Sequence, residues 1–448
     1  MLSKKRLDAA LMMAVTIIVA ACSSGGSSAA PSAAAPSAVA PSTGASAAPS
    51  VEASVAPSGA TASGPPVIPG DADLVIWADD KRAAALKPLA DQYGTDNGVK
   101  VVVQAISKDI IPTFLTASKA GTAPDVVVWA HDVVGNLVAN SAIDPVQGLD
   151  ATKFDPLAIK GMTFDGQVYG VPYSVENIAA FRNTDMIDSC PATMEDLVAA
   201  GVAQVGKGGV TNPMALQVGQ AGDAYHIYPL FSSGGGAFFE PNANGDPDPT
   251  KVAVDSAGSI KAGELIGSIG EKGDKALTTS VDDKNAISLF ATKKTPFLVS
   301  GPWAVADIKK GGVNYDICPI PGWKGLAKAG PFIGVNGFYL ASKGAHKTLA
   351  QDFATSFLTT KDVQVALYQA EPRRPALIEA LNQVTTTDPD IPKFQAASDG
   401  GTILPAIPAM GQVWGPFGVA EAAIVKGDDP KTTLEAAAKA IRDGIAKQ

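Results

Sequence analysis

The chain has 448 residues, 46% of them hydrophobic, which is enough for two domains with separate cores. Its formal net charge of −9 argues against nucleic acid as a partner, because phosphate backbones bind basic surfaces. After the N-terminal segment, no run reaches the roughly 18 apolar residues that a membrane helix requires. The three cysteines and three histidines lack the spacing of a zinc site, so we expect neither a metal nor a cofactor.

The first residues have the parts of a secretory signal peptide. Lys4, Lys5 and Arg6 precede an apolar segment at residues 11–20, and small residues lead into Cys22. Val-Ala-Ala-Cys resembles the bacterial lipobox, which implies that residues 1–21 are removed and that Cys22 becomes a lipidated first residue. The alternative is an ordinary cleavage site that happens to precede a cysteine.

Residues 22–70 consist almost entirely of Ser, Ala, Pro and Gly. Such a segment cannot bury enough apolar surface to offset its chain entropy, so the composition predicts a disordered tether. Serine, threonine and proline in a tether also permit glycosylation.

From residue 73 onward, apolar strand patterns alternate with amphipathic helix patterns. The order strand–helix–strand–helix–strand at residues 73–129 predicts an α/β fold with a parallel sheet. The rhythm restarts near residue 179 and resumes after residue 332, which favours two lobes. We expect strands at residues 74–77, 99–103, 126–129, 168–172, 179–182, 215–218, 296–299, 313–318 and 338–341, and helices at 192–200, 282–290, 346–358 and 362–369.

Aromatic and charged residues follow several strands at the edge where α/β sheets bind ligands. Trp129 and Asp132 come at the end of one buried strand, and Asp80 and Lys81 follow another. Similar pairings of an aromatic with a carboxylate or a tight turn involve Asp223, Tyr225, Trp303 and Trp414. We assign Trp77 and Trp323 to the core, and we expect His131 to hydrogen-bond the backbone near the strand end.

This mixture suits carbohydrate, because a sugar ring stacks its C–H face on an aromatic while its hydroxyls bond to carboxylates. Support for an enzyme is weak: the sequence has no Gly-x-Ser-x-Gly elbow and no phosphate-binding loop. A secreted glycoside hydrolase with paired carboxylates stays open as a less favoured alternative.

Several blocks resemble the maltose/maltodextrin-binding proteins of ABC transporters, which are family 1 extracellular solute-binding proteins. They cover essentially all of residues 73–448: Leu-Val-Ile-Trp (74–77), Ala-Pro-Asp-Val-Val-Val-Trp-Ala-His-Asp (123–132), Tyr-Gly-Val-Pro-Tyr-Ser-Val-Glu (169–176), Ser-Gly-Pro-Trp-Ala (300–304), Pro-Phe-Ile-Gly-Val (331–335) and Ile-Leu-Pro-Ala-Ile-Pro-Ala-Met-Gly-Gln-Val-Trp (403–414). The resemblance implies a two-lobed periplasmic-binding-protein-like fold of type II. Its lobes would comprise residues 71–175 with about 335–380, and 176–334 with about 381–448, joined by three hinge crossings.

By the same resemblance, one set of side chains would bind the sugar from both lobes: Asp80, Lys81, Trp129, Asp132, Glu176, Asp223, Tyr225, Trp303 and Trp414. This chain has Val133 where the best-known member has arginine, Asp223 where it has glutamate, and Gly415 where it has an aromatic. Those departures keep trehalose, a cyclic dextrin or another oligosaccharide open as the ligand.

The expected protein is a monomeric lipoprotein, not an enzyme. The resemblance implies that it is held by Cys22 on the outer face of the bacterial membrane and delivers malto-oligosaccharide to permease subunits. Cys190 and Cys318 form an even pair in an oxidising setting, so one disulfide and two buried free thiols are both open. Arg373 and Arg374 could contribute locally to recognition or form a solvated pair, and we favour the solvated pair.

Overall fold

The structure is a computed structural model that describes residues 66–448. The predicted signal peptide, Cys22 and most of the predicted tether lie outside the described residues. The end of the tether region is described: the backbone carbonyl of Val67 accepts a hydrogen bond from Gln104, and Ile68 packs against the core. Residues 67 and 68, which were predicted to belong to the tether, therefore contact lobe 1.

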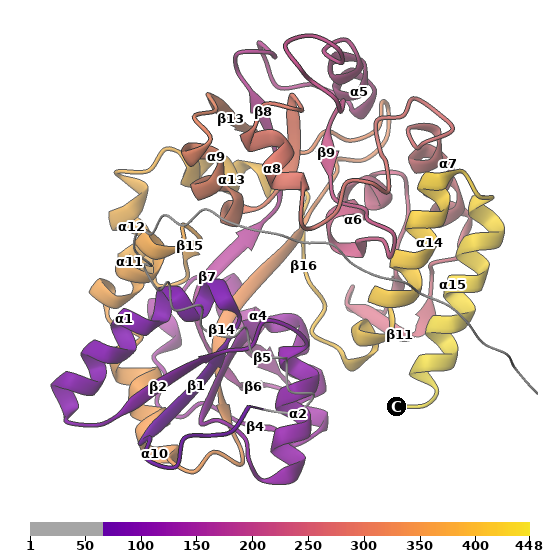
Figure 1. Cartoon of the computed structure of the whole chain (residues 1–448). Helices are drawn as coiled ribbons and strands as arrows, with labels where there is room; N and C mark the ends of the chain where they lie inside the picture. Colours follow the sequence, from indigo (N-terminus) through magenta and orange to yellow (C-terminus); the bar gives the residue numbers. More distant parts are fainter. Residues whose placement is uncertain (1–65) are drawn as a thin grey trace, which may run out of the picture. The chain divides into compact units, whose positions relative to one another are not determined.

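An eight-stranded sheet organises the first lobe, which we call lobe 1 (Figure 1). In spatial order its strands are β15 (Arg374–Pro375), β7 (Gly170–Asn177), β14 (Phe332–Ala341), β3 (Val126–Ala130), β1 (Leu74–Ala78) and β2 (Val101–Ala105), with β4 (Ile143–Asp144) and β16 (Thr402–Ile403) both pairing with β14. The predicted parallel pairing holds for β1 with β2 and with β3. Strand β14 runs antiparallel to β3 and β7, so the whole sheet is mixed, because this strand enters lobe 1 from the other lobe.

Helices cover both faces of this sheet, which explains the uninterrupted apolar strands. In β1, Val75 and Trp77 pack on one face while Leu74 and Ile76 pack on the other. The helices are α1 (Asp80–Asn97), α2 (Ile110–Ala120), α3 (Val134–Ala139), α4 (Pro156–Met162), α10 (Lys347–Asp352), α11 (Lys361–Ala370) and α12 (Ile378–Thr385). Short elements complete the lobe: the 3₁₀ turns η1 (His131–Val133) and η2 (Ala151–Lys153), the hairpin β5 (Thr163–Phe164) and β6 (Gln167–Val168), and a π-helical turn η4 (Phe353–Phe357).

A four-stranded sheet organises the second lobe, lobe 2, in the order β13 (Tyr315–Cys318), β8 (Ala179–Asn183), β12 (Phe297–Ser300) and β9 (Ala215–Leu216). Its helices are α5 (Met194–Val202), α6 (Ala224–Ser233), α7 (Ala257–Ser268), α8 (Ala286–Ala291), α9 (Val305–Lys310), α13 (Asp390–Ala397), α14 (Trp414–Lys426) and α15 (Pro430–Ile445). A hairpin of β10 (Phe239–Pro241) and β11 (Pro247–Val252) and the 3₁₀ turns η3 (Pro302–Ala304) and η5 (Pro408–Gln412) complete it.

The chain passes between the lobes three times, so each lobe is built from separate parts of the sequence. Strand β7 leads into β8, β14 returns to lobe 1, and the third crossing segment, residues 386–413 between α12 and α14, leads back to lobe 2; β7 and β14 run between the lobes in Figure 1. The boundary expected at about residue 380 falls inside α12, whose Ala380 and Val384 are buried in the lobe 1 core. We therefore propose that lobe 1 continues to the end of this helix.

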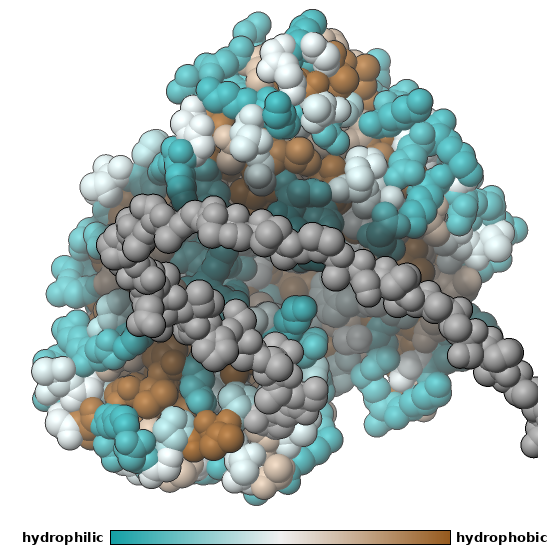
Figure 2. All heavy atoms as spheres, viewed as in Figure 1, coloured by the Kyte–Doolittle hydropathy of each residue, from teal (hydrophilic) through white to brown (hydrophobic). Residues whose placement is uncertain are grey.

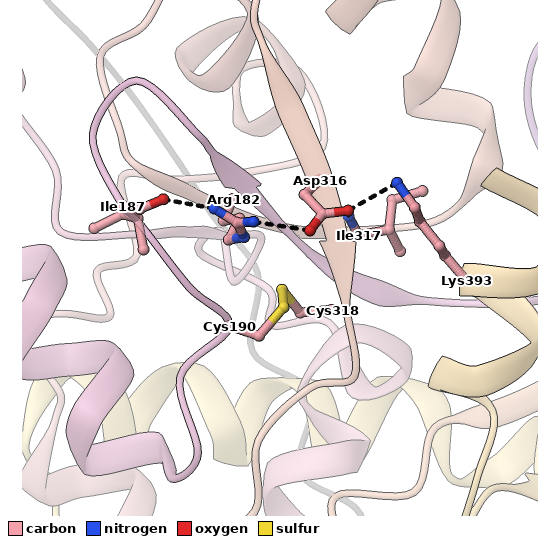
Figure 3. Close-up of a disulfide and its surroundings, with 7 residues drawn as sticks. All are labelled: Arg182, Ile187, Cys190, Asp316, Ile317, Cys318 and Lys393. Carbon is pink, nitrogen blue, oxygen red and sulfur yellow. Dashed lines mark hydrogen bonds and ion pairs between the residues drawn. A yellow bond between two sulfur atoms is a disulfide. The ribbon is translucent and has the colours of Figure 1, made fainter. Parts of the chain in front are cut away.

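A disulfide joins Cys190 to Cys318 in lobe 2, with the two Cα atoms 5.7 Å apart (Figure 3). The sequence left open whether these cysteines form a disulfide or are two buried free thiols, and the structure has the disulfide. On the same sheet, Asp316 of β13 pairs with Arg182 of β8 at 2.9 Å and with Lys393 of α13 at 2.8 Å. These contacts fasten the third crossing segment to lobe 2.

The surface carries few large exposed apolar side chains. Within residues 66–448 the exposed ones are Val67, Val202, Val205, Leu326, Ile378 and Val419, and they come from several different parts of the chain. Hydrophilic residues line most of the visible edges of the molecule (Figure 2). Among the helices of residues 66–448, none combines the length and apolarity needed to cross a bilayer.

Candidate functional site

The first group of site residues comes from the turn between β1 and α1. Asp79 caps α1 and accepts hydrogen bonds from the backbone N–H groups of Lys81 (3.0 Å) and Arg82 (3.1 Å). It also forms an ion pair with the Arg82 guanidinium, one helical turn along. The predicted residue Asp80 is exposed and accepts a hydrogen bond from Ser107 at 3.0 Å. The side chains of Asp79 and Arg82, rather than that of Asp80, therefore belong to this cluster.

Arg82 connects this turn to the centre of the sheet. Its Nε donates to the Tyr173 hydroxyl at 3.0 Å, its Nη2 donates to Asn336, and its guanidinium lies 5.3 Å from the ring centroid of Trp129. Burial alone would lower the pKa of Arg82, but Tyr173 and Asp79 outweigh it and raise that pKa. The arginine is therefore held charged against the tryptophan.

The end of β3 supplies a carboxyl with an unusual pKa. Burial raises the pKa of Asp132 to about 7, and the nearby charge of Arg82 only partly opposes this shift. The carboxyl therefore titrates near neutral pH. Strongly shifted carboxyls of this kind are common at functional sites.

His131, next to Asp132, has a structural role, as expected from the sequence. Its Nδ1 accepts the backbone N–H of Val335 at 3.0 Å, and its Nε2 lies 2.7 Å from the backbone oxygen of Leu404. Only the neutral tautomer protonated on Nε2 satisfies both contacts. Burial lowers the pKa of His131 to about 4, so this tautomer is the one present at neutral pH.

A second buried arginine lies where β7 leaves lobe 1. Arg373 forms ion pairs with Glu176 and, at 2.7 Å, with Glu371, and it is only 6% exposed. Burial and the charge of Arg82 lower the pKa of Arg373 to about 10, and burial raises the pKa of Glu371. The interpretation of Arg373 and Arg374 as a solvated pair is wrong, because Arg374 is also paired, with Asp155 at 2.9 Å.

Lobe 2 presents Asp223 and Tyr225 at the start of α6. Asp223 caps the helix, lies 3.1 Å from the ring of His226 and accepts a hydrogen bond from Gln217. Burial would raise the pKa of Asp223, but His226 and Gln217 outweigh it and lower that pKa to about 2. Asp223 is therefore ionised across the physiological range.

Trp303 stands beside these residues in the turn after β12. Its ring centroid lies 6.5 Å from that of Tyr225 and 6.1 Å from that of His226. The preceding Gly301 is required by this arrangement, because a Cβ atom there would lie 2.2 Å from the indole ring. The Gly-Pro-Trp sequence thus folds the tryptophan back over its own turn.

Trp414 begins α14 and is partly buried against other aromatics. Its ring centroid lies 6.3 Å from that of Phe332 and 6.4 Å from that of Phe238. Trp77 and Trp323 are buried in the core, as predicted. An added Cβ at Gly415 would meet open space, so this position leaves room beside Trp414.

The two lobes meet at this set of side chains. Lys81 of lobe 1 donates a hydrogen bond to the Trp303 carbonyl of lobe 2 at 3.5 Å, and the Arg373 guanidinium lies 5.3 Å from the Trp303 ring centroid. Asp132 is close enough to contribute to the raised pKa of Tyr225 across the lobes, after the larger effect of burial. Aromatic faces and charged hydrogen-bonding groups therefore converge from both lobes. Within residues 66–448 no cluster of three or more potential metal ligands occurs.

The sequence did not assign Asp79, Arg82 or Glu371 to the predicted sugar site. The charged run Asp79–Arg82 follows a strand, so the region could be found from the sequence. Which of its side chains face the site depends on the residue at which the helix begins. Glu371 and Arg373 lie in a loop whose partners are distant in sequence, and no local pattern marks them.

Comparisons with known proteins agree with this architecture. The family model described as "Bacterial extracellular solute-binding protein" matches residues 88–393. The chain is 27% identical over 401 residues to the galactooligosaccharide-binding protein of Bacillus subtilis (strain 168), covering 84% of this chain and 90% of that one. It is 24% identical over 385 residues to the maltooligosaccharide ABC transporter solute-binding lipoprotein of Streptococcus pneumoniae (strain ATCC BAA-255 / R6), covering 84% and 89%.

The fold is also similar to that of a solved structure. The Thermus thermophilus maltotriose-binding protein bound with maltotriose has a TM-score of 0.76 and 28% sequence identity, over 83% of this chain and 100% of that one. The predicted two-lobed fold is confirmed. Because the family model matches more than half of the chain, the chain belongs to the family of bacterial extracellular solute-binding proteins.

Proposed function

We propose that this chain is the extracytoplasmic receptor of an ABC importer and binds malto-oligosaccharide between its lobes. The observation that carries the proposal is the convergence of Trp129 and Asp132 from lobe 1 with Tyr225 and Trp303 from lobe 2. Relatives named for maltooligosaccharide and maltotriose binding support this choice of sugar.

In this proposal the aromatic rings stack on sugar faces and the charged groups bond to hydroxyls. Trp129, Tyr225, Trp303 and Trp414 are partly accessible, which suits stacking. Asp132 and Lys81 would bond to hydroxyls from lobe 1 and Asp223 from lobe 2, through charge-assisted hydrogen bonds. Glu176 would act at the hinge, where Arg373 already holds it.

The partners and location are part of the same proposal. A relative named as a lipoprotein of an ABC transporter supports anchoring through Cys22 and delivery of the sugar to permease subunits. We propose that the receptor acts as a monomer on the outer face of the membrane and catalyses no reaction. Release of reducing sugar over time would instead favour a glycoside hydrolase.

A second candidate ligand is a galacto-oligosaccharide. The relative with 27% identity is named for binding that sugar. The substitutions at Val133 and Gly415 also keep trehalose and a cyclic dextrin in the comparison.

The test is a titration of tryptophan fluorescence, with a protein that begins at residue 23 and so lacks the cysteine. The sugars are maltose, maltotriose, trehalose, a cyclic dextrin and a galacto-oligosaccharide. A saturable change with the linear malto-oligosaccharides supports the proposal. A response only to one of the other sugars moves the assignment to that sugar, and no response to any of them rejects a sugar of this class.

Replacing Trp303 by alanine is expected to weaken binding of the recognised sugar by more than about 1 kcal/mol, roughly fivefold, because a stacking face is lost. Trp303→Phe retains a ring and should lose less. Isothermal titration calorimetry measures both affinities, and circular dichroism checks that the fold is kept. Equal affinities for the alanine variant and the parent protein would remove Trp303 from the site.

Affinity for the sugar is expected to rise between pH 6 and pH 8. With its pKa raised to about 7, Asp132 is mostly protonated at pH 6 and mostly ionised at pH 8, and the ionised form is the stronger acceptor for a hydroxyl. The ionised fraction grows roughly tenfold over this range, which sets the largest affinity gain. Asp132→Asn should give a flatter profile by calorimetry. A parent protein whose profile is equally flat contradicts the role of Asp132.

A further inference from the structure

Trp303 of lobe 2 is contacted by two cationic side chains of lobe 1. The guanidinium carbon of Arg373 lies 5.3 Å from the indole centroid, within the range of a cation–π interaction. The ammonium of Lys81 donates to the backbone carbonyl of the same residue at 3.5 Å. Both contacts cross from one lobe to the other, so they exist only while the lobes are together.

Arg373 is held in this position by its own lobe. Its guanidinium bonds to Glu371, which follows α11, and to Glu176, near the end of β7. The next residue, Arg374, begins β15 and pairs with Val175 in the lobe 1 sheet. A planar guanidinium that bonds two carboxylates has little rotational freedom left, so its face toward Trp303 is fixed before the lobes meet.

Trp303 is equally constrained on the lobe 2 side. Tyr225 and His226 pack beside its ring, and Gly301 allows the ring to fold over its turn. Two pre-positioned groups therefore meet without further ordering, which lowers the entropy that the contact costs.

We propose that Arg373 is a positioning residue that holds lobe 2 closed through Trp303, with Lys81 as a weaker second contact, so that part of lobe closure is independent of the ligand. A receptor whose closed state is populated in advance binds its ligand more tightly, because less of the binding energy is used to close the lobes. The effect on ligand affinity rests on the proposed function, whereas the ligand-independent closure does not.

The test compares Arg373→Met with Arg374→Met. Both variants lose one arginine charge from a paired position of the same loop, but Arg374 pairs with Asp155 inside lobe 1 and serves as the matched control. Small-angle X-ray scattering of the sugar-free proteins gives the radius of gyration. We expect Arg373→Met to increase it and Arg374→Met to leave it unchanged. For Arg373→Lys we expect a smaller increase, because lysine keeps the charge but not the planar face.

Sugar affinity is the second readout. We expect Arg373→Met to lower the affinity for sugar by about tenfold, because losing one desolvated contact can reduce the population of the closed state by that factor. An unchanged radius of gyration for Arg373→Met overturns the proposal whatever the sugar result is, whereas failure of every sugar to bind the parent protein rejects only the proposed function.

A third variant covers the case in which Arg373→Met does not fold. Trp303→Leu removes the aromatic face from the lobe 2 side and leaves the two ion pairs of Arg373 in place. The same increase in the radius of gyration is expected. If the sugar-free Trp303→Leu variant keeps the radius of gyration of the parent protein, the proposed role of the Arg373–Trp303 contact is contradicted, independently of any substitution at Arg373.

Discussion

Reducing the disulfide between Cys190 and Cys318 is expected to lower the free energy of unfolding of lobe 2 by about 4 kcal/mol. The two cysteines are 128 residues apart, so the bond closes a loop that contains most of the lobe 2 chain and restricts the unfolded state. Urea denaturation of the oxidised and the reduced protein, followed by circular dichroism, measures the difference.

The control is the double variant Cys190→Ser with Cys318→Ala, chosen because Cys318 is buried and Cys190 is exposed. Reductant should have no effect on its denaturation midpoint. Both forms of the parent protein should bind sugar alike while folded, since the bond is not among the contacts of the site. Coincident curves for the oxidised and reduced parent would show that the bond does not restrict the unfolded chain.

The strands of lobe 1 could be predicted because a strand buried on both faces must be apolar throughout. Val126–Ala130 and Leu74–Ala78 match that pattern almost residue for residue. Strand β14 was predicted only from residue 338, although it begins at Phe332. Gly334, Asn336 and Gly337 interrupt the apolar pattern, and the structure gives two of them a reason. Asn336 bonds to Arg82, and a Cβ at Gly337 would lie 2.4 Å from Met162.

The aromatic residues were easier to find than their charged neighbours. Trp303 follows a Gly-Pro turn and Trp129 ends a strand, so local sequence marks both. The role of Arg373 could not be predicted, because its partner Glu176 is 197 residues away and an isolated Arg-Arg pair is more often solvated. For Asp79 and Arg82, the start of α1 at Asp80 decides which charges of this run face the cluster, and the local sequence does not mark that start.

Acidification from pH 6.5 to pH 4 is expected to cost about 3 kcal/mol of stability through His131 alone. The folded protein holds the pKa of this histidine near 4, below its ordinary value of 6.5, because burial disfavours the charged ring. Between these two values the unfolded chain binds a proton that the folded chain does not, so stability falls as pH falls. The contribution is fully present above pH 6.5 and lost below pH 4.

The histidine contacts make this effect more than a local one. His131 joins the end of β3 to β14 through Val335 and to the third crossing segment through Leu404. Protonation of Nδ1 breaks the contact with the Val335 N–H, whereas Nε2 still donates to the Leu404 carbonyl, so one of the two contacts is lost. Asp132 has the opposite dependence: its raised pKa favours the folded state at low pH, and this contribution is lost as pH rises toward 7. The total profile therefore mixes two trends of opposite sign.

Comparing the pH dependence of stability of the parent protein with that of His131→Gln separates the contribution of His131 from that of Asp132. Glutamine also has an amide N–H₂ that donates and a carbonyl oxygen that accepts, but it does not titrate, so the variant should keep the Asp132 trend and lose the acid-dependent penalty. The urea midpoints of the two proteins, measured from pH 4 to pH 7.5, should approach each other as the pH is lowered. The parent protein should be the more stable of the two only near neutral pH. Parallel profiles for the two proteins would mean that His131 does not titrate with a lowered pKa, and the hinge would then have no proton-sensitive contact at this position.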